Sequence, residues 1–182
     1  QTVVFSELEV AGGSFIKEQL PKPNTKFEYY QDIAILAFPK PKEFMKIDGL
    51  DYKILSERVR NHLLPDTTSI SNASIISKES VLDVTSQVSK DGLLEWNAPQ
   101  GEWIILRFGH TPIGTTNRPA PPEAKGLEVD KMSKSAVDAY WKGGVQPIID
   151  KLGNLIGTTV NNCLIDSYEV ETTNWTSGFE TQ

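Results

Sequence analysis

The stretch that decides the fold is Glu102-Trp103-Ile104-Ile105-Leu106-Arg107-Phe108. It is rich in β-branched and aromatic residues, which favour strands, and Pro99-Gln100-Gly101 supplies a turn just before it. Further upstream, the turn signal Asp91-Gly92 is followed by Leu94-Glu95-Trp96, where apolar and polar residues alternate with the period of a strand. The sequence therefore predicts short strands separated by tight turns.

More strand candidates lie toward the N-terminus. The first is Val3–Val10, and Gly12-Gly13 ends it. The second is the continuous apolar run Asp32–Phe38, which ends at Pro39. Weaker patterns follow at Ser74–Ser77 and Val81–Val88. Several short strands with turn signals between them are typical of a sandwich or a jelly roll. We therefore predict that residues 1–118 form a β-rich domain.

The period of the pattern changes after the proline-containing loop at Gly114–Lys125, and we place the boundary of a second domain, residues 119–182, in this loop. Ser135 and Asp138 fit a capping box at the start of a helix. Apolar residues at helical spacing then follow at Val137, Trp141, Val145, Ile148 and Leu152. Pro147, preceded by two glycines, predicts a kinked or two-piece helix, and Gly153 is expected to end it.

Short extended segments are expected on both sides of this helix, at Leu127–Asp130 and Asn162–Asp166. Strand, helix and strand make a βαβ unit, which requires a parallel sheet. Cys163, the single cysteine, lies in an apolar run and is expected to be buried and inert. The predicted fold class is thus α+β, with a sandwich or jelly-roll-like part followed by a partial βαβ unit.

Polar residues gather where the second of these strands is expected to end, which is where α/β enzymes place their sites. Asp166 and Glu169 could serve as an acid–base pair, or could cap a solvated loop. Asp130 and Lys131 follow the first strand and precede the helix, which is the position of a catalytic βα loop. They could instead be a charged helix entrance. Trp175 could be a sugar platform or part of a core, with the hydroxyls and amides around it, such as Asn174, favouring a polyol ligand.

The composition excludes several classes of function. The formal net charge is −6 over 182 residues, which argues against nucleic acid or an anionic membrane as the main partner. No apolar stretch approaches the length of a membrane span. The two histidines, His62 and His110, have no partner at metal-ligand spacing and are expected to be structural.

These motifs resemble a known family, the α-L-rhamnosidases of glycoside hydrolase family 106. The matching segments are Gly126–Ser133, Asp166–Glu169, Asn174–Phe179, Trp96–Gly109 and Asp32–Pro39. The resemblance spans nearly the whole chain, and its C-terminal block is the more specific part.

The resemblance implies a large exported bacterial enzyme, secreted or periplasmic, with a (β/α)8 barrel that an inserted β-domain interrupts. Such enzymes release rhamnose from plant glycans by inversion, with two glutamates and a bound Ca²⁺. Glu169 would be the general acid, and the sugar pocket would be lined by Asp130, Lys131, Asp166, Asn174 and Trp175. This chain would be an internal fragment of such an enzyme, and the general base would lie outside it, so we expect the isolated fragment to be inactive. No Ca²⁺ ligand is assigned to a residue.

A second interpretation remains open, in which the β-rich part is a non-catalytic carbohydrate-binding or accessory module and Glu169 is structural. A third is a relative with a different sugar specificity. The oligomeric state is not predicted.

Overall fold

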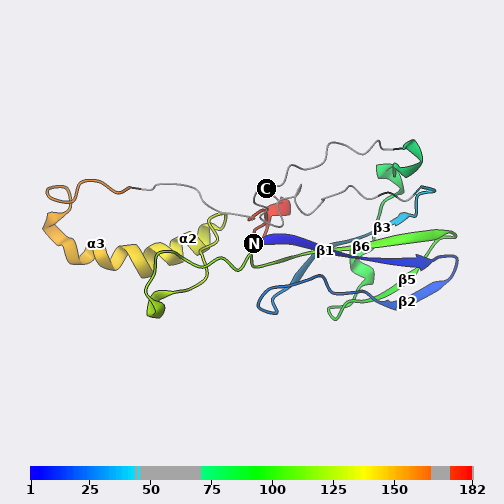
Figure 1. Ribbon diagram of the computed structural model, residues 1–182, viewed down its shortest axis with the longest axis horizontal. Coiled ribbons are helices and arrows are strands. Elements are labelled where there is room, and N and C mark those ends of the chain that lie inside the picture. The colour runs from blue at the N-terminus through cyan, green and yellow to red at the C-terminus, as the bar shows by residue number, and fades with distance from the viewer. Residues whose placement is uncertain (44, 46–70, 165–172, 182) are drawn as a thin grey trace.

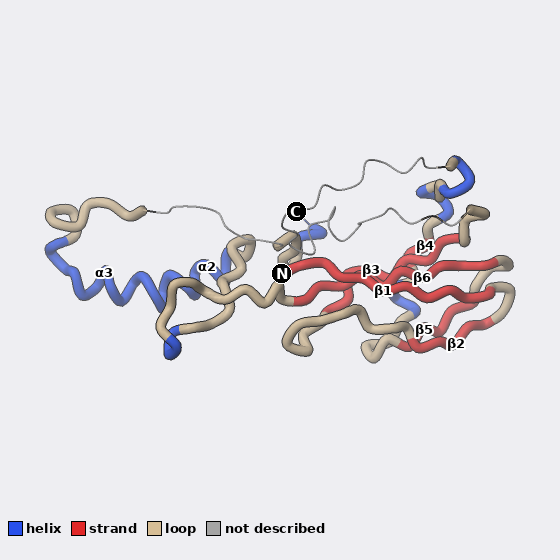
Figure 2. The backbone as a smooth tube through the Cα atoms, viewed as in Figure 1, coloured by secondary structure: helices blue, strands red, loops and turns tan. Residues whose placement is uncertain are grey.

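The computed structural model describes residues 1–43, 45, 71–164 and 173–181 of the chain (Figure 1). Its main sheet has four antiparallel strands in the order β1-β6-β3-β4 (Figure 2). Their bounds are β1 Thr2–Ala11, β3 Gln31–Pro39, β4 Leu82–Asp83 and β6 Glu102–Thr111. The stretch that the sequence singled out is therefore a central strand, and the predicted strands at the N-terminus and at Asp32–Phe38 are confirmed.

A second, two-stranded antiparallel sheet consists of β2 (Phe15–Gln19) and β5 (Leu93–Asn97). The core lies between the two sheets and includes Ile35, Ala37 and Ile105 from the large sheet and Leu94 and Trp96 from the small one. The Trp96 and Trp103 rings meet edge to face at 5.3 Å, and the indole of Trp103 donates to the Pro99 carbonyl oxygen at 2.9 Å. Burial of these large apolar side chains stabilises the facing sheets.

One buried charge sits beside this core. Arg107 is 5% exposed and makes a two-point ion pair with Asp32, with Nε 2.7 Å from Oδ1 and Nη2 2.9 Å from Oδ2. The Tyr30 hydroxyl donates to the same carboxylate at 2.7 Å. The Asp32 carboxylate thus pairs the buried guanidinium, which would otherwise be a buried charge without a partner.

The helical part extends from one end of the sheets as an arm (Figure 1). It consists of α2 (Lys134–Tyr140), a π-helical turn at Trp141–Val145 and α3 (Gln146–Leu152), and no residue of the three segments is buried. The predicted two-piece helix is confirmed: the wide turn accommodates the glycine pair, and Pro147 falls in the first turn of α3, where its missing N–H costs least. The apolar stripe is uncovered, with Ile148 60% exposed.

Three local predictions were wrong. Ser133, two residues before the expected Ser135, caps α2 by accepting from Ala136 N at 3.3 Å, and Asp138 pairs with Lys134. No strand forms at 74–77, and within 81–88 only Leu82 and Asp83 form a strand, with Val88 in an isolated bridge to Leu94. Ser71 and Asp83 accept from nearby backbone N–H groups and favour short 3-10 turns instead.

The predicted βαβ unit is not confirmed. Leu127 makes a single antiparallel bridge with Thr116, and no strand forms at 162–164. Cys163 is exposed and Leu164 is 87% exposed, so the expectation that the cysteine is buried was wrong. An apolar run is buried only where another element packs on it, and the described elements pack elsewhere. The two-domain division at residue 118/119 stays a prediction, and the family's barrel stays an expectation.

Candidate functional site

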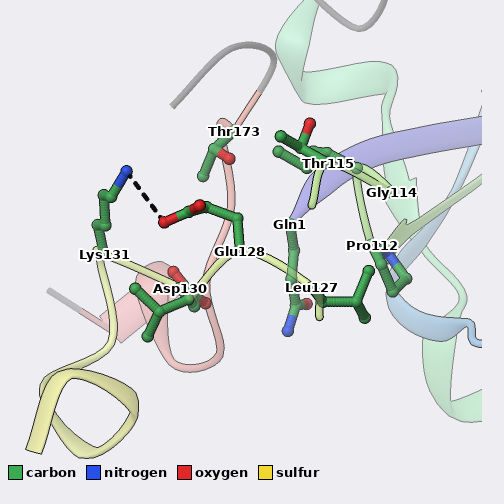
Figure 3. Close-up of a pocket in the computed structure, with 11 residues that line it drawn as sticks. Gln1, Pro112, Gly114, Thr115, Leu127, Glu128, Asp130, Lys131 and Thr173 are labelled. Carbon is green, nitrogen blue, oxygen red and sulfur yellow. Dashed lines mark ion pairs between the residues drawn. The ribbon is translucent and has the colours of Figure 1, made fainter. Parts of the chain in front are cut away.

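A pocket of about 180 Å³ lies where β1 begins and β6 ends. Because these strands are antiparallel, the start of one and the exit of the other share one end of the sheet. Figure 3 shows the side chains around the pocket. Its lining residues are Gln1, Pro112, Ile113, Gly114, Thr115, Leu127, Glu128, Val129, Asp130, Lys131 and Thr173.

Backbone pairing brings the two main walls together. Glu128 N donates to the Thr115 carbonyl oxygen at 2.9 Å, and Asn117 N donates to the Gly126 carbonyl oxygen at 3.0 Å. The Asn117 side chain closes the loop by accepting from Gly126 N at 2.8 Å and donating to the Ala124 carbonyl oxygen at 3.0 Å. The proline-rich loop therefore folds back on itself and presents residues 127–131 opposite residues 112–115.

The carboxylate of Asp130 is held at both oxygens. Oδ1 accepts from Met132 N at 3.1 Å and Oδ2 accepts from the Thr176 hydroxyl at 2.9 Å. The Asp130 carbonyl oxygen also accepts from Ser133 N at 3.1 Å, in the turn that enters α2. Each carboxylate oxygen has a further lone pair, so Asp130 can still accept hydrogen bonds from a ligand.

Lys131 and Glu128 form an ion pair on one wall of the pocket, with Nζ 3.3 Å from Oε1 (Figure 3). Their side chains are 27% and 28% exposed, so the pair is reachable by a ligand. The pocket thus joins two carboxylates, one lysine and two threonine residues, a donor and acceptor set suited to hydroxyl groups.

Asn174 and Trp175 lie next to the pocket but not among the residues that line it. Asn174 Oδ1 accepts from Val3 N at 2.8 Å, and the backbone N–H groups of residues 174 and 175 both donate to the Gln1 carbonyl oxygen, at 3.0 and 3.2 Å. The Trp175 ring stacks on His110 at 6.3 Å and meets Phe179 edge to face at 5.5 Å. Their visible contacts anchor the C-terminal segment to β1 and β6; contact with sugar stays a prediction.

Asp166 and Glu169 lie outside the described residues. Of the predicted site residues, the structure brings Asp130 and Lys131 into one pocket and places Asn174 and Trp175 beside them. Sequence reasoning missed Thr115 and Thr173 in the lining and the contact from Thr176. Threonines in loops were visible in the sequence, but no local pattern says which of them face a common pocket.

His110 was expected to be structural, and it is 4% exposed beneath Trp175. Burial is the largest effect on its pKa and lowers it, since desolvation disfavours the charged imidazole, whereas the charge of Glu180 acts to raise it. Within the part of the chain that the structure describes, three buried polar atoms at this end of the sheet have no hydrogen-bond partner: Gln1 Oε1, Thr2 Oγ1 and His110 Nδ1.

The Ca²⁺ that the family resemblance implies stays an expectation. Among the described residues no group of three or more His, Cys, Asp or Glu side chains could hold a metal ion. The pocket's two carboxylates are engaged by Lys131, Thr176 and Met132.

The α-L-rhamnosidase family model, glycoside hydrolase family 106, matches residues 49–182. This range covers the acidic wall of the pocket, the helical arm and the C-terminal segment. The chain belongs to the family 106 α-L-rhamnosidases.

Two longer proteins are similar to this rhamnosidase-family chain. A rhamnosidase structure from Novosphingobium sp. PP1Y matches 96% of the chain with a TM-score of 0.70 at 21% identity, which shows a shared fold. A Formosa agariphila protein named "Putative beta-glucuronidase" is 62% identical over all 182 residues. The chain spans 30% of the length of the first and 16% of the second. Among the described residues of the rhamnosidase-family chain, no helix is long and apolar enough to cross a membrane.

Proposed function

We propose that this chain is part of a glycoside hydrolase that cleaves α-L-rhamnosides, and that the pocket at Asp130 and Lys131 binds the sugar. The observation that carries the proposal is that the family match covers the wall made by residues 127–131 and Thr173. Carboxylates and a lysine beside threonine hydroxyls can accept from and donate to the hydroxyl groups of a sugar ring. Carbohydrate is the proposed partner, and export is proposed with it.

In the complete protein Glu169 is the proposed general acid. In an inverting glycosidase, one carboxylic acid protonates the leaving oxygen, and a second carboxylate activates water on the opposite face of the ring. We assign the second role to a residue outside this chain, so the isolated 182-residue chain is proposed to be inactive. Asp166 is a proposed sugar contact, as are Asn174 and Trp175.

The charge of the pocket favours a neutral sugar over a glucuronide. The lining side chains include two carboxylates, Glu128 and Asp130, and Lys131 is the single cation of the described lining and is paired with Glu128. A glucuronide carries its own carboxylate, which would face Asp130. Comparison of aryl α-L-rhamnoside with aryl β-D-glucuronide as substrates of the complete protein separates the two activities, and faster cleavage of the glucuronide would contradict the proposal.

The role of Glu169 is tested with Glu169→Gln in the complete protein, with Glu79→Gln on an exposed turn as the control. An amide cannot protonate the leaving oxygen, so the variant should lose roughly 10²–10⁴-fold in turnover of an alkyl rhamnoside. A dinitrophenyl rhamnoside, whose leaving group needs no proton, should lose far less. An equal loss with both leaving groups would refute general-acid catalysis by Glu169.

A second candidate, an accessory carbohydrate-binding surface, is favoured by one observation. A groove between β1 and β2 is lined by Leu8–Ala11 and Ser14–Glu18, and it holds Phe15, which is 57% exposed. An exposed aromatic ring is a suitable platform for a sugar. Phe15→Ala in the complete protein should weaken retention on rhamnose-containing oligosaccharides if this surface binds glycan; unchanged retention excludes it.

A further inference from the structure

Asp130 and Thr176 are brought together although 46 positions separate them in the chain. Asp130 lines the pocket, whereas Thr176 is 3% exposed and lies behind it. Their contact is a charge-assisted hydrogen bond, in which the hydroxyl donates to Oδ2 at 2.9 Å. Such bonds are roughly twice as strong as those between neutral groups.

The position of Thr176 is itself fixed from two sides. The preceding residues are tied to the large sheet through Asn174, which binds Val3 N and the Gln1 carbonyl oxygen. On the other side, the Thr176 carbonyl oxygen accepts from Phe179 N at 3.2 Å in the turn that follows. The hydroxyl therefore projects from a backbone that is anchored to the N-terminal residues and to its own turn, and not to the loop that carries Asp130.

The second contact of Asp130, from Met132 N to Oδ1, comes from its own turn and would persist in any rotation of that turn as a unit. The bond from Thr176 is different, because it links the loop that carries Asp130 to a separate segment. It fixes which way the carboxylate faces relative to Thr173 and Gln1, which also line the pocket.

We propose that Thr176 is a positioning residue, which holds the Asp130 carboxylate in the orientation that accepts two neighbouring hydroxyl groups of the sugar. This inference rests on the proposed function, since it assigns Asp130 to sugar binding. Thr176 does not touch the ligand and acts through Asp130.

The test uses Thr176→Val and Thr176→Ser in the complete protein, assayed on an aryl α-L-rhamnoside. Valine has a similar shape but lacks the hydroxyl, and serine retains it. Thr181→Val is the matched control, since the Thr181 hydroxyl lies in the same segment, is exposed and donates to the Gly178 carbonyl oxygen at 2.8 Å. Thr176→Val should raise KM roughly tenfold with kcat within about twofold, because weaker binding of the ground and transition states alike changes KM and leaves kcat unchanged.

Thr176→Ser should restore most of the wild-type KM, and Thr181→Val should not alter it. In an Asp130→Ala background, Thr176→Val should have no further effect, because coupled residues are not additive. An unchanged KM in Thr176→Val, or an equal effect in both backgrounds, overturns the positioning role while the proposed function stands. If the wild-type protein neither cleaves nor binds rhamnosides, the proposed function fails and the inference fails with it.

Discussion

The side-chain oxygen of Asn174 accepts a hydrogen bond from the backbone N–H of Val3 at 2.8 Å, across 171 positions of the chain. This bond occupies an edge position of β1 that a neighbouring strand would otherwise fill. The bond joins the C-terminal segment to the start of β1. In Figure 1 the red C-terminal turn lies beside the start of this strand.

Asn174→Ala should lower the free energy of unfolding of the chain by about 1–2 kcal/mol, since the half-buried Val3 N–H loses its partner. Urea unfolding followed by tryptophan fluorescence measures the change. Asn162→Ala is the control, because Asn162 is exposed and its amide donates to the adjacent Asn161. Equal stability of the two variants would show that the Val3 contact contributes nothing.

The Asp32–Arg107 pair should make stability depend on pH at acidic values. Burial acts to raise the pKa of Asp32, but the hydrogen bonds from Arg107 and Tyr30 and the guanidinium charge outweigh it and hold the pKa below 3.8. A carboxyl whose pKa is lowered on folding stabilises the protein above its unfolded pKa, and this contribution disappears as the pH falls through the folded value.

Asp32→Asn should therefore be less stable than the wild type at about pH 6, and the gap should narrow as the pH falls below about 3.8. Denaturant unfolding at a series of pH values measures this gap. Asp91→Asn, on an exposed turn, is the comparison. A gap that stays constant down to about pH 2 would contradict the linkage.

Gly109 lies in β6 against the Tyr30 ring, and a Cβ at this position would overlap that ring and the Gln31 carbonyl oxygen. Gly109→Ala should therefore cost about 1–3 kcal/mol by overpacking. Gly143→Ala is the matched control, because a Cβ there meets no atom within 4 Å and alanine favours helix, so a gain of about 0.5–1 kcal/mol is expected. Thermal unfolding of both variants measures the contrast, and a harmless Gly109→Ala would disprove the close approach.

Lys131→Met in the complete protein should raise KM for an aryl rhamnoside about tenfold, because the pocket loses its ammonium donor and Glu128 loses its partner. Lys134→Met, three positions on and 89% exposed, should leave KM unchanged. Steady-state kinetics of the two variants decides whether Lys131 contacts the sugar; matching KM values would remove it from the site.

The sequence was most informative where structure is local. The strand at Glu102–Thr111 followed from its β-branched and aromatic composition, and the two-piece helix followed from Gly143-Gly144 and Pro147. Prediction failed at the start of α2, because Ser133 and Ser135 are both plausible caps and the backbone selected the first. It also failed at Cys163, because burial depends on what packs over a segment.

The candidate site was predicted in part for the same reason. Asp130 and Lys131 were named because they follow a short extended segment and precede a helix, and because the family resemblance implies a sugar pocket there; both line the pocket. Thr115 and Thr173 were missed, since they reach the pocket from segments that are distant in sequence. Glu169 and Asp166 were named from a family resemblance and lie outside the described residues.

The sequence by itself determined the strands β1, β3, β5 and β6, the helix break and the family. Periodicity, backbone restriction by proline and glycine, and shared motifs are all present in neighbouring residues. Only the tertiary structure decided that β5 pairs with β2, that Asn174 binds the edge of β1 and that Thr176 holds Asp130. These contacts join residues that are 46 to 171 positions apart, or strands with other elements between them. Such pairings depend on how the whole chain buries its apolar surface, which no local pattern encodes.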